Sequence, residues 1–511
     1  MQNNDKKVLL RISNLKQYFP LKGGRFVKAN DGISLDIYEG ETFGLVGESG
    51  CGKSTLGRTI LQLYHQTYGR TMYYGRSLDD LAPKYVIDTV KNLKSRRAKL
   101  HELEQKRDKL EAEYAKLSET EQYAKHTELD TARKLAEDAL LDITKIVGGF
   151  LVVDDLDPVI AAYSKDYGIA RRISALEEKR QALQVDVDDA QYAKKTAEEA
   201  GKSAKAGQLE KAQEKLKQCD DQIAALRQQL DAGRQEIEAL RQPYVNDPEF
   251  QKYEAYRDDG IDLARLEYNE MRRLRSDMQL IFQDPYSSLN PRMSVGQIIS
   301  EGMQAHNMIK KKDARMQQLV LNIMDECGLA PYFLHRFPHQ FSGGQRQRIG
   351  IARALATNPK FVVCDEAVSA LDVSIQAQII NLLLDLKEHQ NLTYMFITHD
   401  LSVVKYISDR VGVMYLGTMV ELAAADEIFH HPIHPYTEAL LNAIPTTDTV
   451  GAKELSILEG DIPSPVNPPK GCKFHTRCKY CTEICTQVVP EWEEVRPNHF
   501  VACHHKLEVK E

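Results

Sequence analysis

The clearest indication of the fold is the stretch Thr42-Phe43-Gly44-Leu45-Val46-Gly47-Glu48-Ser49-Gly50-Cys51-Gly52-Lys53-Ser54. It opens with a mostly apolar run that suits a buried strand, and from Gly47 onward it fits the pattern G-x-x-x-x-G-K-[ST]. In that pattern backbone N–H groups curl around phosphates, the lysine reaches the β- and γ-phosphates, and the last hydroxyl binds Mg²⁺. The stretch therefore predicts an α/β nucleotide-binding domain with phosphate-loop contacts from Gly47, Glu48, Ser49, Gly50, Cys51, Gly52, Lys53, Ser54 and Thr55.

A second apolar run, Phe361-Val362-Val363-Cys364, ends in the two carboxylates Asp365 and Glu366. Such a run is weak evidence by itself, but after a phosphate loop it is the expected second half of a phosphoryl-transfer site. We expect Asp365 to help hold Mg²⁺ and Glu366 to polarise the attacking water.

The segment Phe341-Ser342-Gly343-Gly344-Gln345, followed by the helical stretch from Arg346 to Arg353, resembles the signature of the ATP-binding cassette (ABC) ATPases. Further elements of that family occur in their proper order: Tyr18, Gln283 in Phe282-Gln283-Asp284-Pro285, Ser369-Ala370-Leu371-Asp372, and His399 in Thr398-His399-Asp400. The resemblance implies an ABC-type P-loop domain that hydrolyses ATP. One position departs from the family, because Ala367 follows Glu366 where proline is usual. We expect a less rigid loop there and retained hydrolysis.

The resemblance also implies a role for each of these residues. Tyr18 stacks on adenine, Gln283 senses Mg²⁺ and contacts the transport pore, and His399 touches the γ-phosphate beside the catalytic Glu366. Ser54, Gln283 and Asp365 form the magnesium site. The signature lies far along the chain from the phosphate loop, so it serves best as a clamp on the nucleotide of a neighbouring cassette. The residues expected to act in trans are Ser342, Gly343, Gly344, Gln345 and Asp372.

Three stretches resemble the ATP-binding subunits of bacterial oligopeptide and dipeptide importers. They are the run from Phe282 to Met293, His434-Pro435-Tyr436-Thr437, and the tail that begins Gly471-Cys472-Lys473-Phe474-His475-Thr476-Arg477-Cys478. The resemblance implies a second cassette, expected to be a distinct paralogue, and two transmembrane permease subunits, with an extracellular solute-binding protein as an indirect partner. The expected location is peripheral, on the cytoplasmic face of the cell membrane.

Between about Pro83 and Leu266 the composition shifts to Lys, Glu, Gln, Ala and Leu, with no proline from Val86 to Asp157 or from Val159 to Gln242. Apolar residues alternate there by three and four positions, which predicts a coiled coil: Leu209, Ala212, Leu216, Cys219, Ile223, Leu226, Leu230, Gly233, Ile237 and Leu240. The segment from Gly148 to Gly168 interrupts the pattern and predicts that two helices fold back as one antiparallel hairpin. The alternative is a pair of solvated helices collapsed on the domain.

These features predict an ABC nucleotide-binding domain in two parts, residues 1–82 and 267–445, an inserted coiled-coil hairpin at 83–266, and a small cysteine-rich module at 446–511. ABC ATPases of chromosome maintenance and DNA repair also place a long coiled coil before the signature, and they are the alternative function. Those proteins carry a hinge domain or a C-x-x-C hook at the tip, whereas the region from Ile146 to Ala170 has no cysteine. Transport is therefore favoured. A docking module for another protein is a third interpretation of the hairpin.

The tail spaces Cys472, Cys478, Cys485 and Cys503 as C-x₅-C-x₆-C-x₁₇-C, with Cys481 as an extra cysteine. Four thiolates can complete a tetrahedral zinc site or hold a [4Fe–4S] cluster. The importer resemblance favours the cluster, and Zn²⁺ and unligated thiols remain as alternatives. The histidines of the tail are expected to be solvated or outer-shell groups and not ligands: His475, His499, His504 and His505.

The bulk composition limits the remaining classes. At 511 residues the chain is too long for one compact core. Its formal net charge of −7 supplies no global basic field, so nucleic acid is not an expected partner. No run approaches the roughly 18 apolar residues of a membrane-spanning helix, and the N-terminus is polar. We expect contact with a membrane only through partners.

Overall fold

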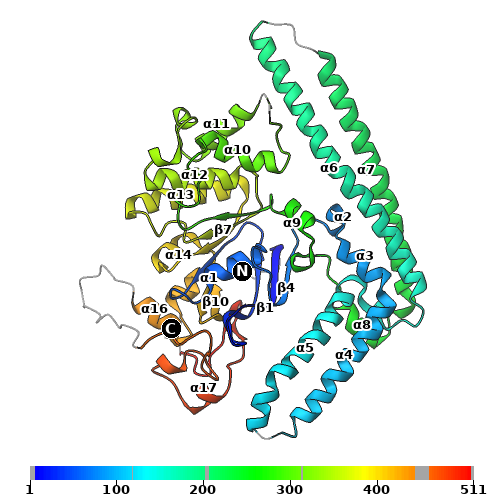
Figure 1. The fold of residues 1–511 in the computed structure, drawn as a ribbon, viewed down its shortest axis with the longest axis vertical. Coiled ribbons are helices and arrows are strands. Elements are labelled where there is room, and N and C mark those ends of the chain that lie inside the picture. The colour runs from blue at the N-terminus through cyan, green and yellow to red at the C-terminus, as the bar shows by residue number, and fades with distance from the viewer. Residues whose placement is uncertain are drawn as a thin grey trace. The chain divides into compact units, whose positions relative to one another are not determined.

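The structure, a computed structural model, describes residues 6–117, 119–201, 206–311, 313, 315–443 and 460–507. They divide into two compact units (Figure 1). The first, called the cassette unit below, takes the chain up to Thr71 and from Arg272 onward. The second, the helical unit, is Met72–Met271. Strand β4 (Tyr68–Tyr73) and helix α9 (Tyr268–Leu274) carry the chain between them.

An eight-stranded sheet forms the centre of the cassette unit, in the order β11-β12-β10-β9-β3-β8-β7-β6. β3, β7 and β8 are buried along their whole length, as parallel strands covered on both faces are. β6 and β9 extend this parallel core, and the other strands are added antiparallel at one edge. The predicted α/β cassette fold is confirmed. The bounds are β3 Thr42–Val46, β6 Met278–Ile281, β7 Phe361–Asp365, β8 Thr393–Ile397, β9 Arg410–Tyr415, β10 Thr418–Ala424, β11 Glu493–Arg496 and β12 His499–Val501.

Two long strands, β1 (Val8–Pro20) and β2 (Phe26–Tyr38), form an antiparallel ribbon. Its register pairs Tyr18 with Lys28 and Lys16 with Asp31. The ribbon therefore brings Tyr18 close to the charged side chains of Lys28 and Asp31 on β2.

Helices cover the sheet of the cassette unit, and one apolar core joins α10, α11, α12 and α13 to β6, β7 and β8. Polar residues fix where several of these helices begin, because their side chains accept hydrogen bonds from first-turn N–H groups. Ser294 caps α10, Ser342 caps α12, Asp372 caps α13 and Asp400 caps α14. The bounds are α1 Lys53–Ile60, α10 Val295–Ala305, α11 Met316–Glu326, α12 Gly343–Leu355, α13 Val373–Gln390, α14 Leu401–Ile407, α15 Ala425–His430, α16 Pro435–Asn442 and α17 Glu483–Gln487.

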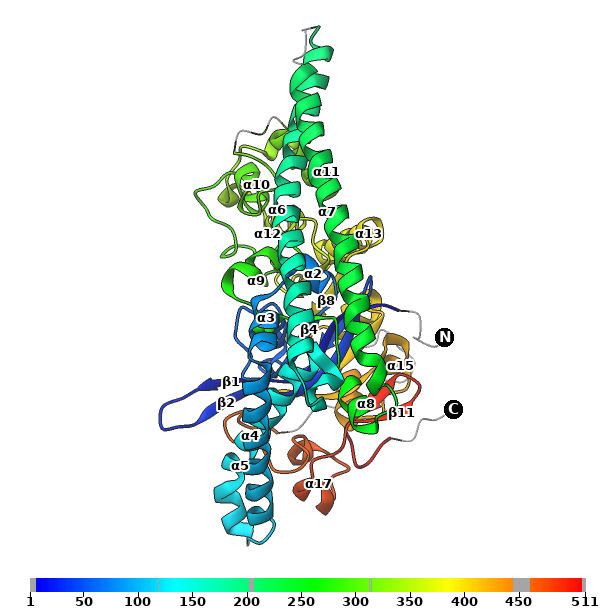
Figure 2. The same cartoon turned by 90° about the vertical axis from the view of Figure 1, so that its right-hand side faces the viewer.

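Two antiparallel helix pairs dominate the helical unit and point in opposite directions from a shared base (Figure 2). In the long pair, α6 and α7, Lys165 binds Glu236 and Arg180 binds Asp220. The apolar stripe of α7 packs on α6 through Cys219, Ile223, Leu226 and Leu230. The bounds are α2 Leu78–Leu81, α3 Lys84–Lys91, α4 Leu93–Tyr114, α5 Glu119–Val147, α6 Asp157–Glu199, α7 Ala206–Arg241, α8 Pro248–Glu254 and β5 Ile261–Asp262.

The prediction of one hairpin turning between Gly148 and Gly168 is wrong. The chain reverses twice, between α4 and α5 and between α6 and α7, and Gly168 lies inside α6. Phe150 is fully buried and contacts the rings of Tyr163 and Phe250, with centroids 6.2 and 5.7 Å away. The glycines do break the helix here, but the apolar residues beside them form the core at which the two pairs meet. A hairpin tip would instead expose them.

The C-terminal residues take part in the sheet of the cassette unit. β12 pairs with β10, so Val501 lies opposite Glu421, and β11 follows at the sheet edge. Behind this pairing, the buried Nε2 of His499 lies 2.7 Å from the buried Oε1 of Glu421. Of the two states expected for the tail histidines, solvated or outer-shell, His499 is therefore not in the solvated one. The expected module boundary between residues 445 and 446 lies outside the described residues.

Candidate nucleotide-binding site

The phosphate loop joins the end of β3 to the start of α1, and its backbone conformation requires glycine at two positions. Gly47 and Gly52 have φ values of 150° and 103°. A Cβ at Gly47 would lie 2.2 Å from the carbonyl oxygen of Met414, and one at Gly52 would lie 2.1 Å from that of Ala29. Side chains at either position would clash with neighbouring backbone, so the loop can close only with glycine.

Lys53 is the first residue of α1 and is folded into the loop. Its Nζ donates hydrogen bonds to the carbonyl oxygens of Gly47 and Glu48, at 2.8 and 2.9 Å. The side chain is 4% exposed. The ammonium group is thus held at the centre of the loop, where phosphate oxygens would be its natural partners.

Ser54 and Asp365 meet although they are far apart in sequence. The Ser54 hydroxyl donates to Oδ1 of Asp365 at 2.5 Å, and Nη2 of Arg58 lies 3.1 Å from Oδ2. Asp365 is the last residue of the buried strand β7 and is 1% exposed. Mg²⁺ prefers oxygen ligands, and here a hydroxyl oxygen and a carboxylate oxygen lie side by side. Ser54 and Asp365 therefore fit a magnesium site.

Glu366 lies next to them and is held in an unusual conformation. Its φ is 48°, a value that costs a non-glycine residue about 1–3 kcal/mol. Its N–H donates to the carbonyl oxygen of Ile397 at 2.9 Å. Nε2 of Gln283 donates to Oε2 of Glu366 at 2.6 Å, and Nδ1 of His399 lies 3.4 Å from Oε1. The structure therefore brings Gln283, Glu366 and His399 together around one carboxylate.

The loop after Glu366 is pinned despite having Ala367 in place of proline. Ala367 is buried in the apolar core, and the Ser369 hydroxyl donates to the carbonyl oxygen of Glu366 at 3.0 Å. Nε2 of Gln376 donates to the carbonyl oxygen of Val368 at 2.9 Å. These contacts restrain the loop without the proline ring.

The signature residues lie at the start of α12. The Ser342 hydroxyl accepts from the N–H of Gln345, and the Gln345 side chain accepts from the N–H of Ser342, so they form a capping box. Gly344 faces α13, where an added Cβ would lie 2.5 Å from Cγ2 of Ile375. In the described part of the chain no hydrogen bond joins Ser342–Gln345 to the phosphate loop. The structure does not bring these two motifs together within one chain.

Asp372 caps α13 and is exposed to solvent. It accepts from the Ser374 hydroxyl at 2.8 Å and from the N–H of Ile375 at 3.0 Å. These hydrogen bonds lower the pKa of Asp372 below its usual value, so the side chain stays charged.

Tyr18 lies on β1 with its hydroxyl donating to Oδ1 of Asp31 at 2.5 Å. The other Asp31 oxygen accepts from Nζ of Lys473 at 3.1 Å. Burial alone would raise the pKa of Asp31, but Lys473, Tyr18 and Lys16 together lower it. Lys28 also approaches the Tyr18 ring, with its Nζ 5.8 Å from the centroid.

The sequence analysis missed two residues that contact the phosphate loop directly although they lie far from it along the chain. Arg477 donates to both carboxylate oxygens of Glu48, at 2.7 and 3.0 Å. The Tyr436 hydroxyl accepts from the N–H of Glu48 at 2.9 Å. The only available signal was indirect, since an acidic residue inside a loop that binds anions needs a cation nearby.

The four tail cysteines Cys472, Cys478, Cys485 and Cys503 lie close enough to one another for their charges to interact. Burial raises the pKa of Cys472 to about 11, with Cys485 and Cys478 adding to the effect. Burial also raises the pKa of Cys503 to about 12, with further contributions from the other three. Cys481 is exposed. Across the described ranges, no group of three or more His, Cys, Asp or Glu side chains is arranged to hold a single metal ion.

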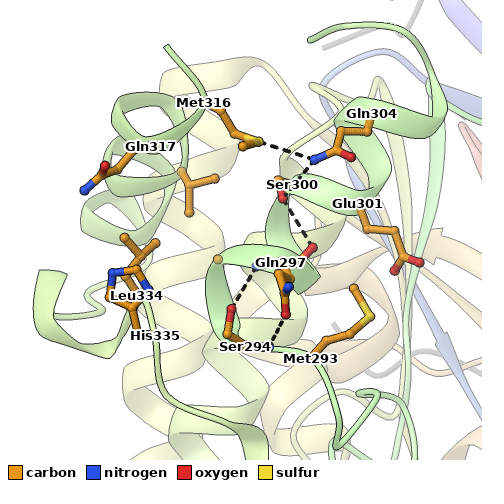
Figure 3. Close-up of a pocket in the computed structure, with 12 residues that line it drawn as sticks. Met293, Ser294, Gln297, Ser300, Glu301, Gln304, Met316, Gln317, Leu334 and His335 are labelled. Carbon is orange, nitrogen blue, oxygen red and sulfur yellow. Dashed lines mark hydrogen bonds between the residues drawn. The ribbon is translucent and has the colours of Figure 1, made fainter. Parts of the chain in front are cut away.

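A pocket of about 670 Å³ opens between α10, α11 and the residues before α12 (Figure 3). Nε2 of Gln304 on α10 contacts the Met316 sulfur on α11 at 3.3 Å across it. The pocket is lined by Met293, Ser294, Gly296, Gln297, Ser300, Glu301, Gln304, Met316, Gln317, Val320, Leu334 and His335. None of these belongs to the nucleotide motifs, so the pocket is a separate surface of the cassette unit.

A helix that crosses a membrane must be both long and apolar. Among the residues that the structure describes, no helix combines the length and the apolar character needed to cross a bilayer.

Comparison with known proteins places the chain in a family. A model of the ABC transporters matches residues 30–252 and 251–369, and a model described as the oligopeptide/dipeptide transporter C-terminal region matches residues 420–485. The oligopeptide transport ATP-binding protein AppF of Bacillus subtilis is 52% identical over 250 residues, which are 48% of this chain and 75% of AppF. A Brucella ovis protein named as a peptide import ATP-binding protein is 53% identical over 245 residues, 48% of this chain and 77% of its own.

The Bacillus subtilis protein YkfD, named as an oligopeptide transport ATP-binding protein, is 34% identical over 498 residues, which cover 97% of this chain and 95% of YkfD. These named relatives are transport proteins, and the chromosome-maintenance alternative is not favoured. The ABC model and YkfD each span well over half of the chain, and the cassette fold agrees with them. The chain therefore belongs to the ABC transporter ATP-binding proteins of the oligopeptide/dipeptide transporter family, and it is an ATP-hydrolysing subunit.

Proposed function

We propose that this chain powers the import of oligopeptides or dipeptides by hydrolysing ATP. The observation that carries the proposal is the match of residues 420–485 to the C-terminal region of oligopeptide/dipeptide transporters. That region contains Cys472, Cys478 and Cys485 and lies outside the motifs that ABC ATPases share. The names of AppF and YkfD support the same solute class.

We assign the chemistry to the residues gathered at the end of the parallel sheet and to Tyr18 on β1. Lys53 and the loop N–H groups bind the phosphates, and Tyr18 stacks on adenine. Ser54, Asp365 and Gln283 would hold Mg²⁺, which neutralises charge on the phosphate oxygens when it is bound. Glu366 takes the proton of the attacking water, and His399 faces the γ-phosphate.

The separation of the signature residues from the phosphate loop supports a pairing of this chain with a second cassette. Because no hydrogen bond joins Ser342–Gln345 or Asp372 to the phosphate loop of their own chain in the described structure, we propose that they act on nucleotide held by a second cassette. The second cassette is a distinct paralogue, and two permease subunits anchor the pair at the cytoplasmic face of the membrane. The pocket between α10 and α11 is our candidate for the permease contact. Its open polar rim and adaptable methionines suit a partner segment.

Purification of the intact complex in mild detergent tests this function. We expect a second cassette and two membrane proteins to co-elute with the chain, and peptide delivered by the solute-binding protein to raise ATP hydrolysis. A cysteine introduced at Gln317 should crosslink to a permease subunit, whereas one at the exposed Glu388 on α13 should not. Co-elution with DNA, or hydrolysis indifferent to peptide, would contradict the proposal.

We further propose that residues 83–266 are an insertion into a cassette of residues 1–82 and 267–445, followed by a module at 446–511. The matched part of AppF is 75% of AppF but only 48% of this chain, so AppF is the shorter protein. The division of the contacts at Thr71 and Arg272 also supports an insertion. The helical pairs would serve as a coiled-coil docking arm for another protein.

Replacing residues 84–265 by a short linker should leave a folded ATPase in the complex. The expected result is near-normal basal hydrolysis together with loss of a binding partner from pull-downs. Aggregation of this variant under conditions in which the full chain is stable would show that the helical unit belongs to the fold of the cassette.

For the tail we propose a [4Fe–4S] cluster on Cys472, Cys478, Cys485 and Cys503. Burial and the neighbouring cysteines raise the pKa values of Cys472 and Cys503, so a bound cation would favour their thiolate forms. A [4Fe–4S] cluster would be held by four cysteine thiolates, and the tail supplies four besides the exposed Cys481. The group would be structural or redox-sensing, because it lies outside the nucleotide motifs.

Anaerobic purification followed by elemental analysis checks the cluster. Iron and acid-labile sulfide should be present, should be lost in Cys485→Ser, and should be retained in the matched control Cys481→Ser. Stoichiometric zinc without iron would reject the cluster and keep the ligands.

A further inference from the structure

The segment between Cys472 and Cys478 touches the nucleotide site at two points. Arg477 reaches the phosphate loop at Glu48, and Lys473 reaches Asp31, the partner of Tyr18. We propose that Arg477 and Lys473 are positioning residues for ATP binding, so that the cysteine-bearing segment sets the affinity of the nucleotide site. The inference rests on the proposed roles of the phosphate loop and Tyr18 and extends them to a remote part of the chain.

The Arg477 contact has the geometry of a strong ion pair. Its two Nη atoms lie 2.7 and 3.0 Å from the two carboxylate oxygens of Glu48, which is the bidentate arrangement. The Arg477 side chain is only 4% exposed and that of Glu48 is 23% exposed, so solvent screens the pair weakly. The hydrogen bond to Glu48 raises the pKa of Arg477 further above its usual value.

Glu48 is therefore fixed through three of its groups. Its carboxylate is held by Arg477, its N–H by the Tyr436 hydroxyl, and its carbonyl oxygen accepts from Lys53. Two of these partners come from the C-terminal part of the chain. Freeing the carboxylate would remove the side-chain anchor of a residue whose carbonyl oxygen holds the Lys53 ammonium group in the loop, and small misplacements of such groups are costly.

The Lys473 contact acts on the other end of the nucleotide site. Its Nζ lies 3.1 Å from Oδ2 of Asp31 and 3.2 Å from the carbonyl oxygen of Leu416. Oδ1 of Asp31 accepts from the Tyr18 hydroxyl. Burial lowers the pKa of Lys473, and the Asp31 carboxylate opposes this effect. Lys473 thus holds the carboxylate that orients the ring proposed to stack on adenine.

One buried ring, that of Phe474, lies in the segment between the two contacts. Phe474 is 2% exposed, and its ring centroid lies 5.2 Å from those of Tyr415 and Tyr436. Lys473 precedes it, and Arg477 ends the short turn that follows, His475–Arg477. Because Phe474 anchors this turn in the apolar core with Cys472 and Cys478, a displacement of the cysteines would reach Glu48 and Asp31 at once.

The experiment measures ATP binding and hydrolysis by the intact complex carrying Arg477→Ala. We expect the Kd for a fluorescent ATP analogue and the KM for ATP to rise about tenfold, with kcat at saturating ATP changed by less than about twofold. Arg477→Lys should give an intermediate Kd. Its ammonium group keeps the positive charge beside Glu48 but cannot form the two parallel hydrogen bonds that the guanidinium donates. Lys473→Met should also weaken binding.

Lys479→Ala is the matched control. Lys479 lies in the same segment beside Cys478, and its Nζ is 2.9 Å from Oε2 of Glu438 instead of a nucleotide-site residue. It should leave the Kd for ATP unchanged. Metal content and the melting temperature, measured for every variant, separate a positioning effect from a loss of fold.

Glu48→Gln weakens the same ion pair by changing its other partner, the loop residue Glu48. It tests whether the pair sets the affinity for ATP if Arg477→Ala does not fold. It should raise the Kd to a similar extent, and the double variant should bind no more weakly than either single one. Wild-type affinity in folded Arg477→Ala or in Glu48→Gln, or additive effects in the double variant, would overturn the inference. A wild-type complex that fails to bind ATP would instead reject the proposed nucleotide site.

Discussion

Glu366→Gln should bind ATP as tightly as the wild type and hydrolyse it at least about 100-fold more slowly. The substitution removes the basic carboxylate and leaves the phosphate loop untouched. Its amide oxygen can still accept the hydrogen bond that Gln283 donates to Glu366 at 2.6 Å, so the arrangement of the site should persist. The loss is therefore expected in kcat and not in the affinity for nucleotide.

Phosphate release by the purified complex at saturating ATP measures this loss, and a fluorescent analogue measures binding. Glu388→Gln, on the exposed face of α13, is the matched control and should turn over normally. If Glu366→Gln kept near-normal turnover, another group would have to be the base, and the neighbouring His399 would become the first candidate.

Lys53→Ala should weaken the binding of ATP itself, the step that precedes hydrolysis. A hydrogen bond to a charged group is worth about 1.5–3 kcal/mol, so losing the contact with the phosphates should raise the Kd for ATP by about 10- to 150-fold. The variant also loses the two bonds that Nζ donates to the loop carbonyls of Gly47 and Glu48. The loop should then hold its shape less well even when empty.

Equilibrium binding of ATP with and without Mg²⁺ is the measurement for Lys53→Ala, and a melting curve shows whether the fold survives. Lys405→Ala, an exposed lysine on α14, is the control for the loss of one positive charge and should bind normally. Unchanged affinity and activity in Lys53→Ala would contradict the assignment of this lysine to the phosphates.

Local sequence was enough to find most of the candidate site. The stretch ending in Lys53 and Ser54 and the run ending in Asp365 and Glu366 are continuous segments, and each carries its chemistry within one strand and the turn that follows. The order of these motifs also predicted that they form the two halves of one phosphoryl-transfer site. The structure agrees, since Ser54 and Asp365 are in direct contact.

The same reasoning misplaced the turns of the helical unit. A glycine and proline cluster near Gly148 marks a break in the helix, but sequence pattern does not say whether a break is an exposed tip or a buried junction. Here Phe150 is buried against Phe250, a residue 100 positions away. Burial by a remote partner is what turned the break into the junction of two helix pairs.

The α/β cassette, the phosphate loop, the acidic pair and the spacing of the cysteines could all be identified from the sequence, because each is carried by residues within one short segment. The pairing of Arg477 with Glu48 across 429 positions and of Lys473 with Asp31 across 442 became visible only in the folded chain. Such pairs are fixed by how the sheet, its edge strands and the buried Phe474 pack, and no local pattern of residues encodes that packing.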